Sequence, residues 1–136
     1  MKRTLFVFAV LILPIFCSPG MDRLDALSQL ESHDNDHAIG RQREVSRYQI
    51  LPVVWEHANV DWRPADPATA RTVVSAIMDA RCREFEARYH RAPDDFEYYI
   101  LWHRPACLVG RPIPRPLTLA EKDRGRRFVN LCQSRE

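Results

Sequence analysis

Beyond its first twenty residues, the chain carries no net charge. The formal charge of the whole sequence is +2, and Lys2 and Arg3 are the only charged residues among residues 1–20, so the remainder balances to zero. Binding to nucleic acid depends on an excess of Lys and Arg that neutralises phosphates. Here charges of both signs alternate along the sequence, as on a solvated helical surface. We therefore expect no nucleic-acid partner.

The chain also lacks a hydrophobic run of membrane-spanning length. The run Leu5–Phe16 is too short to cross a bilayer comfortably, and it follows a basic start and precedes the small residues Ser18-Pro19-Gly20. This order is typical of a secretory signal peptide. We predict a signal peptide at residues 1–20, export to the periplasm or out of the cell, and no membrane attachment after cleavage. An uncleaved N-terminal anchor is the alternative.

Cysteine is scarce, and its spacing fits no zinc site. Of the four cysteines, Cys17 lies in the predicted signal peptide, where the bulky Phe16 before it disfavours lipid modification. The other three are Cys82, Cys107 and Cys132. Export permits a disulfide, and Cys107 with Cys132 is the preferred pair because both lie in the C-terminal third. We expect neither a metal nor a cofactor.

Helical signals organise residues 21–136, which are enough for one compact domain without internal repeats. Helices are predicted over residues 22–31, from 52, over 67–89, over 94–102 and after 118. Each start carries a capping residue or a proline: Asp22, Pro52, Asp66-Pro67, Asp94 with Glu97, and Thr118 with Glu121. Four prolines make residues 105–116 a stiff loop. The prediction is a mainly α, small single-domain fold with at most a minimal β element.

Glu31 is the residue whose position suggests chemistry. It closes an apolar helix and precedes a loop rich in short polar residues. The partial negative charge of a helix C-terminus disfavours an ionised carboxylate, and burial would add to that effect. A carboxyl that stays protonated near neutral pH is what a general acid in glycoside cleavage requires. Position alone, however, favours an ordinary surface glutamate at a helix end.

A longer pattern follows Glu31. The pair Glu31-Ser32 is followed by Ala38 and then by Gln49-Ile50-Leu51-Pro52. In type and spacing these residues resemble the signature of the soluble lytic transglycosylase catalytic domain, a member of the lysozyme-like superfamily. More loosely, the segment Tyr99–Ala106 occupies the place of that family's Ala-x-Tyr-Asn-x-Gly, and Phe128-Val129 that of its final Tyr-Val.

The sequence departs from that family at three places. Arg43 and Ser46 stand where family members usually have glycine, and Trp102-His103 replaces a Tyr-Asn pair. An imidazole and an asparagine amide can each hydrogen-bond a sugar, although their reach differs. These departures fit either a divergent enzyme or a domain that binds glycan without cutting it.

The resemblance implies a lysozyme-like domain over residues 21–136 that cleaves the peptidoglycan backbone between N-acetylmuramic acid and N-acetylglucosamine. Glu31 would be the catalytic acid and base. The expected substrate-binding residues are Ser32, Tyr48, Gln49, Trp102 and His103. The partner would be the glycan strand, bound by a monomer; a catalytically inactive or weak peptidoglycan-binding module is the alternative.

A hydrolase would need a second carboxylate. Asp34, Asp36 and Glu44, all in the loop after Glu31, are the candidates. Acidic loop residues are usually solvated, so none of the three stands out. The segment His33–His37 could suggest a metal, but no second cluster completes a site.

Overall fold

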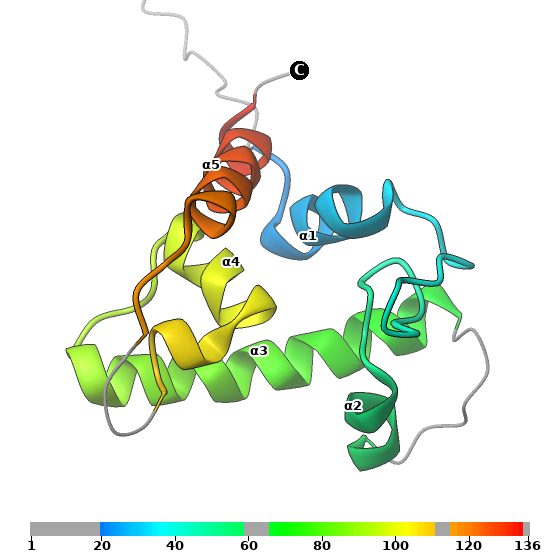
Figure 1. Cartoon of the computed structure of the whole chain (residues 1–136), viewed down its shortest axis with the longest axis horizontal. Helices are drawn as coiled ribbons and strands as arrows, with labels where there is room; N and C mark the ends of the chain where they lie inside the picture. Colours follow the sequence, from blue (N-terminus) through cyan, green and yellow to red (C-terminus); the bar gives the residue numbers. More distant parts are fainter. Residues whose placement is uncertain (1–19, 59–65, 111–114, 135–136) are drawn as a thin grey trace, which may run out of the picture.

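The computed structural model of the chain describes residues 20–58, 66–110 and 115–134 (Figure 1). The elements in this part of the chain are α1 (Arg23–Ser32), α2 (Pro52–His57), α3 (Pro67–Tyr89), α4 (Asp95–His103), the 3₁₀ helix η1 (Pro105–Cys107) and α5 (Leu119–Gln133). In the described residues β structure is limited to isolated bridges, which pair Val45 with Ile39 and with Ile50. The predicted mainly α, single-domain fold is confirmed.

The predicted caps explain where the helices begin. The Asp22 carboxylate accepts the backbone N–H groups of the first turn of α1, and Asp66 does the same for α3. The helices α4 and α5 each begin with a complete capping box, Asp94 with Glu97 and Thr118 with Glu121. Each cap satisfies N–H groups that a helix start otherwise leaves unpaired.

The long helix α3 forms one side of the molecule; α1 and α4 contact it, and α5 packs against α4 and α1 (Figure 1). The core between them consists mainly of fully buried apolar side chains, among them Leu27, Trp55, Met78, Phe85, Tyr99, Ile100 and Phe128. The close approach of α5 to α4 depends on Gly125, because a Cβ there would lie 2.6 Å from the Phe96 ring. This packing brings the C-terminal end of α1 close to the facing sides of α4 and α5.

The proline-rich segment differs from the prediction. The proline-rich segment was expected to be loop throughout, but it opens with the single 3₁₀ turn of η1, which suits a proline at its first position. Residues 111–114 of that segment lie outside the described residues.

The preferred disulfide is wrong. Cys107 and Cys132, like Cys82, are free thiols. The charge of Glu121, in the first turn of α5, acts on Cys107, whereas Cys132 is eleven residues further along the same helix. At about 1.5 Å per residue this separation is roughly 16 Å, far beyond the reach of a disulfide.

The predicted signal peptide lies outside the described residues, apart from Gly20. None of the helices in the described ranges is both long and apolar enough to cross a membrane. Gly20 itself lies against the last turn of α5, since a Cβ on it would overlap the Cys132 carbonyl.

Candidate active site

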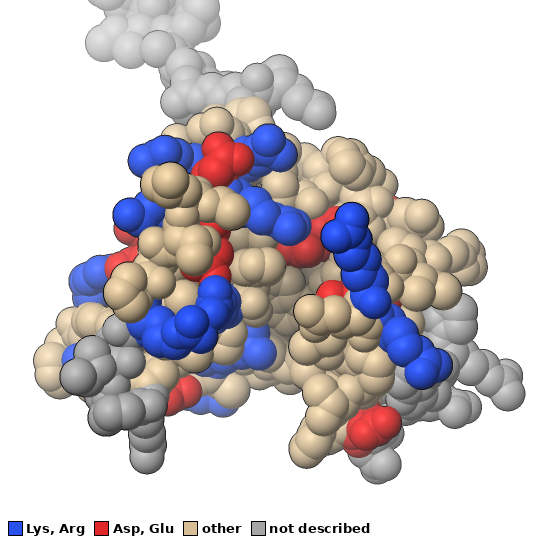
Figure 2. All heavy atoms as spheres, in the orientation of Figure 1, with Lys and Arg blue, Asp and Glu red and all other residues tan. Residues whose placement is uncertain are grey.

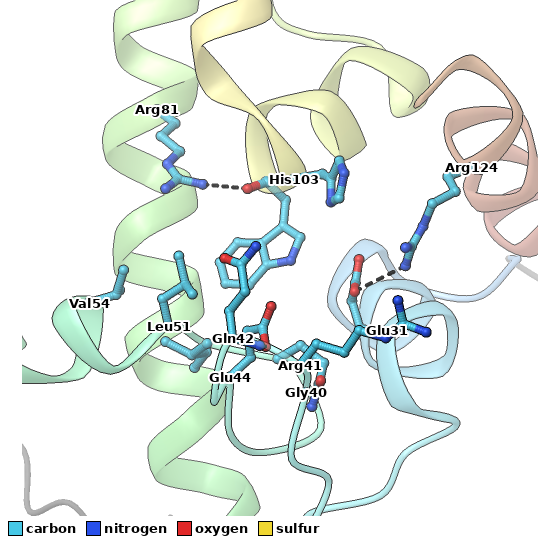
Figure 3. Close-up of a pocket in the computed structure, with 13 residues that line it drawn as sticks. Glu31, Gly40, Arg41, Gln42, Glu44, Leu51, Val54, Arg81, His103 and Arg124 are labelled. Atoms are coloured by element: carbon cyan, nitrogen blue, oxygen red, sulfur yellow. Dashed lines mark hydrogen bonds and ion pairs between the residues drawn. The ribbon is translucent and has the colours of Figure 1, made fainter. Parts of the chain in front are cut away.

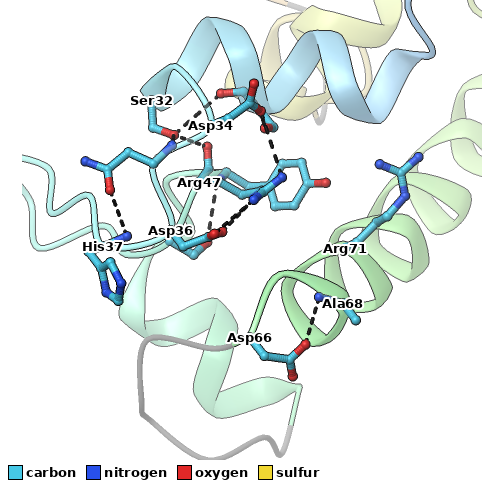
Figure 4. A network of polar contacts seen from close by, with 12 residues as sticks. Ser32, Asp34, Asp36, His37, Arg47, Asp66, Ala68 and Arg71 are labelled. Carbon is cyan, nitrogen blue, oxygen red and sulfur yellow. Dashed lines mark hydrogen bonds and ion pairs between the residues drawn. The ribbon is translucent and has the colours of Figure 1, made fainter.

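The loop that follows Glu31 is held by a network of polar contacts (Figure 4). Arg47 donates to both carboxylate oxygens of Asp36, at 2.6 and 2.9 Å. The Ser32 hydroxyl donates to the Arg47 carbonyl at 2.8 Å and accepts the Asn35 N–H. Ser28, on the buried side of α1, bonds Asp34. These contacts fix the loop to the last turn of α1. Residues 39–50, called the returning segment below, then lead the chain back past Glu31.

The returning segment turns sharply through residues that have positive φ. Arg43, Ser46 and Gln49 have φ values of 66°, 69° and 51°. This left-handed region costs an L-residue roughly 1–2 kcal/mol and favours glycine. Arg43 and Ser46 are the two positions where the resemblance expects glycine. The backbone therefore keeps the conformation that glycine would allow, although the glycines are absent.

Gly40 is needed for close packing within this segment. A Cβ at Gly40 would overlap Oε2 of Glu44 and lie 2.6 Å from Oε1 of Gln49. The Glu44 carboxylate also accepts the Gln42 N–H at 2.8 Å. The missing side chain at Gly40 thus leaves room for Glu44 and Gln49 to lie side by side.

A pocket of about 500 Å³ opens between this segment and the helices (Figure 3). Its lining comes from α1, the returning segment, α2, α3, α4 and α5, and consists of Glu31, Gly40, Arg41, Gln42, Glu44, Gln49, Ile50, Leu51, Val54, Arg81, Trp102, His103 and Arg124. Figure 2 shows this face hollowed, with acidic atoms between basic side chains. A concave site with converging polar groups is the usual form of a ligand-binding site.

The Glu31 carboxylate is held at this pocket by two donors. The Tyr99 hydroxyl donates to Oε1 and Arg124 donates to Oε2, each at 3.1 Å. The Glu31 side chain is 9% exposed, whereas that of Arg124 is 39% exposed. The two donors therefore fix the carboxylate in place, and its cation, Arg124, comes from a distant part of the chain.

Tyr99 is well suited to donate this hydrogen bond. It is fully buried and stacks on His103, with the ring centroids 5.7 Å apart. Burial and then the neighbouring Glu31 carboxylate raise the pKa of the Tyr99 hydroxyl well above its usual value. The hydroxyl therefore keeps its proton throughout the physiological range of pH.

Trp102 and His103 line the pocket at the end of α4. Arg81 of α3 lies over the Trp102 ring, 5.6 Å from its centroid, and donates to the Leu101 and Trp102 carbonyls at 2.8 Å. These bonds satisfy carbonyls that the helix end leaves unpaired. The Trp102 ring is thus fixed where it can offer an apolar face to a ligand.

The expected site residues divide into two groups. Glu31, Gln49, Trp102 and His103 line the pocket. Ser32 and Tyr48 are not among its lining residues: the Ser32 hydroxyl bonds within the loop, and Tyr48 is a core residue that is 1% exposed. Both therefore stabilise this segment on the side away from the pocket. The sequence does not show which side chains of a tight turn face the pocket and which face the core.

The three candidate second carboxylates lie in different surroundings. Glu44 lines the pocket with Glu31, whereas Asp36 is paired with Arg47 and Asp34 bonds Ser28. No group of three or more His, Cys, Asp or Glu residues in the described part of the chain is placed to hold a metal. The acidic loop thus serves mainly to position the segment that carries Glu44 and Gln49.

Sequence reasoning missed Arg124. It belongs to an arginine-rich stretch of α5 in which Arg126 and Arg127 are exposed to solvent. Nothing local distinguishes the one arginine that faces the pocket, and the pairing depends on how α5 packs against α1.

Comparisons with known proteins add nothing to this geometry. No family model, no curated protein and no solved structure matches the chain.

Proposed function

We propose that the chain is a peptidoglycan lytic transglycosylase with Glu31 as its single acid and base. One observation carries the proposal: Glu31, Gln49, Trp102 and His103, chosen from the sequence, line one pocket. The left-handed backbone at Arg43 and Ser46 supports it, because the transglycosylase pattern has glycine at both positions. Under this proposal the domain is lysozyme-like, and it acts outside the cytoplasm.

In the proposed reaction, Glu31 donates a proton to the oxygen that links N-acetylmuramic acid to N-acetylglucosamine. The carboxylate then takes the proton from the C6 hydroxyl of the muramic acid, whose oxygen closes a 1,6-anhydro ring. No water is consumed. Trp102 offers a flat apolar face to a sugar ring, while Gln49 and His103 supply hydrogen bonds beside it. Tyr99 holds the carboxylate toward the pocket.

A second candidate is a module that binds the same glycan without cutting it. The contacts of Glu31 favour this reading, since Tyr99 and Arg124 each occupy one of the carboxylate oxygens that an acid catalyst must offer to its substrate. A third outcome is hydrolysis, for which Glu44 is the carboxylate placed to assist water.

Digestion of purified peptidoglycan sacculi tests these outcomes together. The purified protein should release anhydro-muropeptides, read by mass spectrometry, and Glu31→Gln should reduce their release by a factor of about 10² or more, as expected for a lost general acid. Glu56→Gln, an exposed glutamate on α2, is the matched control and should stay active.

The products identify the alternatives. Reducing ends in place of anhydro ends would indicate a hydrolase. Retained binding to sacculi without any release would support the binding module, and neither release nor binding by a folded protein would refute the proposal.

A further inference from the structure

Among the pocket arginines, Arg124 has unused hydrogen-bonding capacity. Arg81 already donates to two carbonyls of α4. In the described part of the chain, Arg124 makes its ion pair with Glu31 through Nη2, and it also lies near the Tyr99 hydroxyl, whose pKa it acts to lower. A guanidinium has five N–H donors, and this side chain is 39% exposed. Most of its donors are therefore free to meet a ligand.

The charge balance of the pocket favours an anionic ligand. Its charged lining residues are three arginines (Arg41, Arg81 and Arg124) and two glutamates (Glu31 and Glu44). An incoming carboxylate would restore the balance, and it would meet Arg124 on the open side of the ion pair (Figure 3).

We infer that Arg124 is a substrate-sensing residue that exchanges Glu31 for a carboxylate of the bound glycan. The ligand class is a glycan that carries carboxylates. In muramic acid these are the lactyl carboxylate, where no stem peptide is attached, or a carboxylate of the stem peptide. Arg124 binds that carboxylate in a bidentate geometry and leaves Glu31, which is then buried without its cation. Glu31, released from its cation, is then free to meet the glycosidic oxygen.

This inference rests on the proposed function and extends it to specificity and control. It removes the conflict between an acid catalyst and its arginine partner, because the ion pair belongs to the empty pocket. It also predicts that a neutral chain of N-acetylglucosamine, which has no carboxylate, would leave the ion pair in place.

Binding measurements by titration calorimetry test the exchange. The probes are a chitooligosaccharide and a muramic-acid-containing glycan of the same length. The unaltered protein should bind the carboxylate-bearing glycan about tenfold or more tightly, the size expected for a charge-assisted bond. Arg124→Gln should lose this preference, Arg124→Lys should keep part of it, and Arg126→Gln, on the exposed side of the same helix, should keep all of it.

Glu31→Gln supplies a readout that a merely structural arginine would not give. Without the competing carboxylate, Arg124 is free. This variant should therefore bind the carboxylate-bearing glycan more tightly than the unaltered protein does, and should bind the neutral glycan as tightly as the unaltered protein does. Equal binding of both glycans by the unaltered protein, or an unchanged preference in Arg124→Gln, would overturn the inference alone. Absence of binding to either glycan would overturn the proposed function with it.

Discussion

At the scale of single residues, the site depends on residues whose backbone conformation is unfavourable. Arg43 and Ser46 occupy left-handed backbone positions without the freedom of glycine. Their cost is offset by two successive turns. Around Arg43, the Gly40 N–H donates to the Glu44 carbonyl at 2.9 Å; around Ser46, Val45 and Ile50 exchange both backbone hydrogen bonds at 2.9 Å. That pair aligns Gln49 and Glu44 on the pocket side. The strained turn is therefore a means of positioning the site.

Replacing Arg43 by glycine should stabilise the protein. Arg43 is exposed, and its φ of 66° is one that glycine adopts without a steric penalty. Arg43→Gly should raise the free energy of unfolding by about 1 kcal/mol, measured from the urea midpoint. The matched control is Arg41→Gly in the same loop, where φ is not positive and glycine should cost roughly 0.4–1 kcal/mol. A loss of stability in Arg43→Gly would contradict the assigned turn.

At the scale of elements, helix starts were the most predictable feature. Asp22, Asp66, Asp94 and Thr118 all cap the helices expected from them, because a cap depends on residues within one turn. The partners of Glu31 depend instead on packing. Tyr99 and Arg124 lie 68 and 93 residues away in the sequence, and no local rule selects them. The sequence therefore predicted which carboxylate lies in the pocket but not which cation pairs with it.

The start of α5 should make folding sensitive to acid. The Glu121 carboxylate accepts the Thr118 N–H at 2.8 Å and bonds Arg104 at 2.6 Å. The Thr118 N–H and then Arg104 lower the pKa of Glu121 from 4.5 to about 2. Because the folded pKa is depressed, its stabilisation is fully present above pH 4.5 and is lost as the pH falls toward 2.

Glu121→Gln should therefore cost about 2 kcal/mol at pH 7, and the difference from the unaltered protein should shrink below pH 4.5. Urea unfolding across this pH range measures both effects. Asp123→Asn, which removes an exposed ion pair with Arg127 on the same helix, is the control and should change stability by about 0.5 kcal/mol or less. A pH-independent difference would show that Glu121 contributes through packing alone.

At the scale of the whole molecule, the fold is held by packing, with no disulfide among its described cysteines. Burial, the largest cause in each case, raises the pKa of the Cys82, Cys107 and Cys132 thiols, that of Cys132 to about 11. The thiols are therefore protonated at neutral pH and react slowly with oxidants and disulfides.

The melting temperature should accordingly be the same with and without a reductant. A native disulfide contributes roughly 2–4 kcal/mol, so reducing one would lower the melting temperature by several degrees. The complementary measurement is alkylation of the unfolded, unreduced protein, followed by mass spectrometry. Modification of Cys82, Cys107 and Cys132 is expected, and a protected pair would contradict the free thiols of the structure.

The way the pocket is assembled has a consequence for timing. Its lining begins at Glu31 and is completed only by Arg124, on the last helix of the chain. Contacts between residues so far apart in sequence form late, after the intervening chain has been ordered. During synthesis, a chain that has not yet delivered α5 has no closed site. Ligand binding therefore requires the completed fold, and a molecule that lacks α5 has no complete pocket.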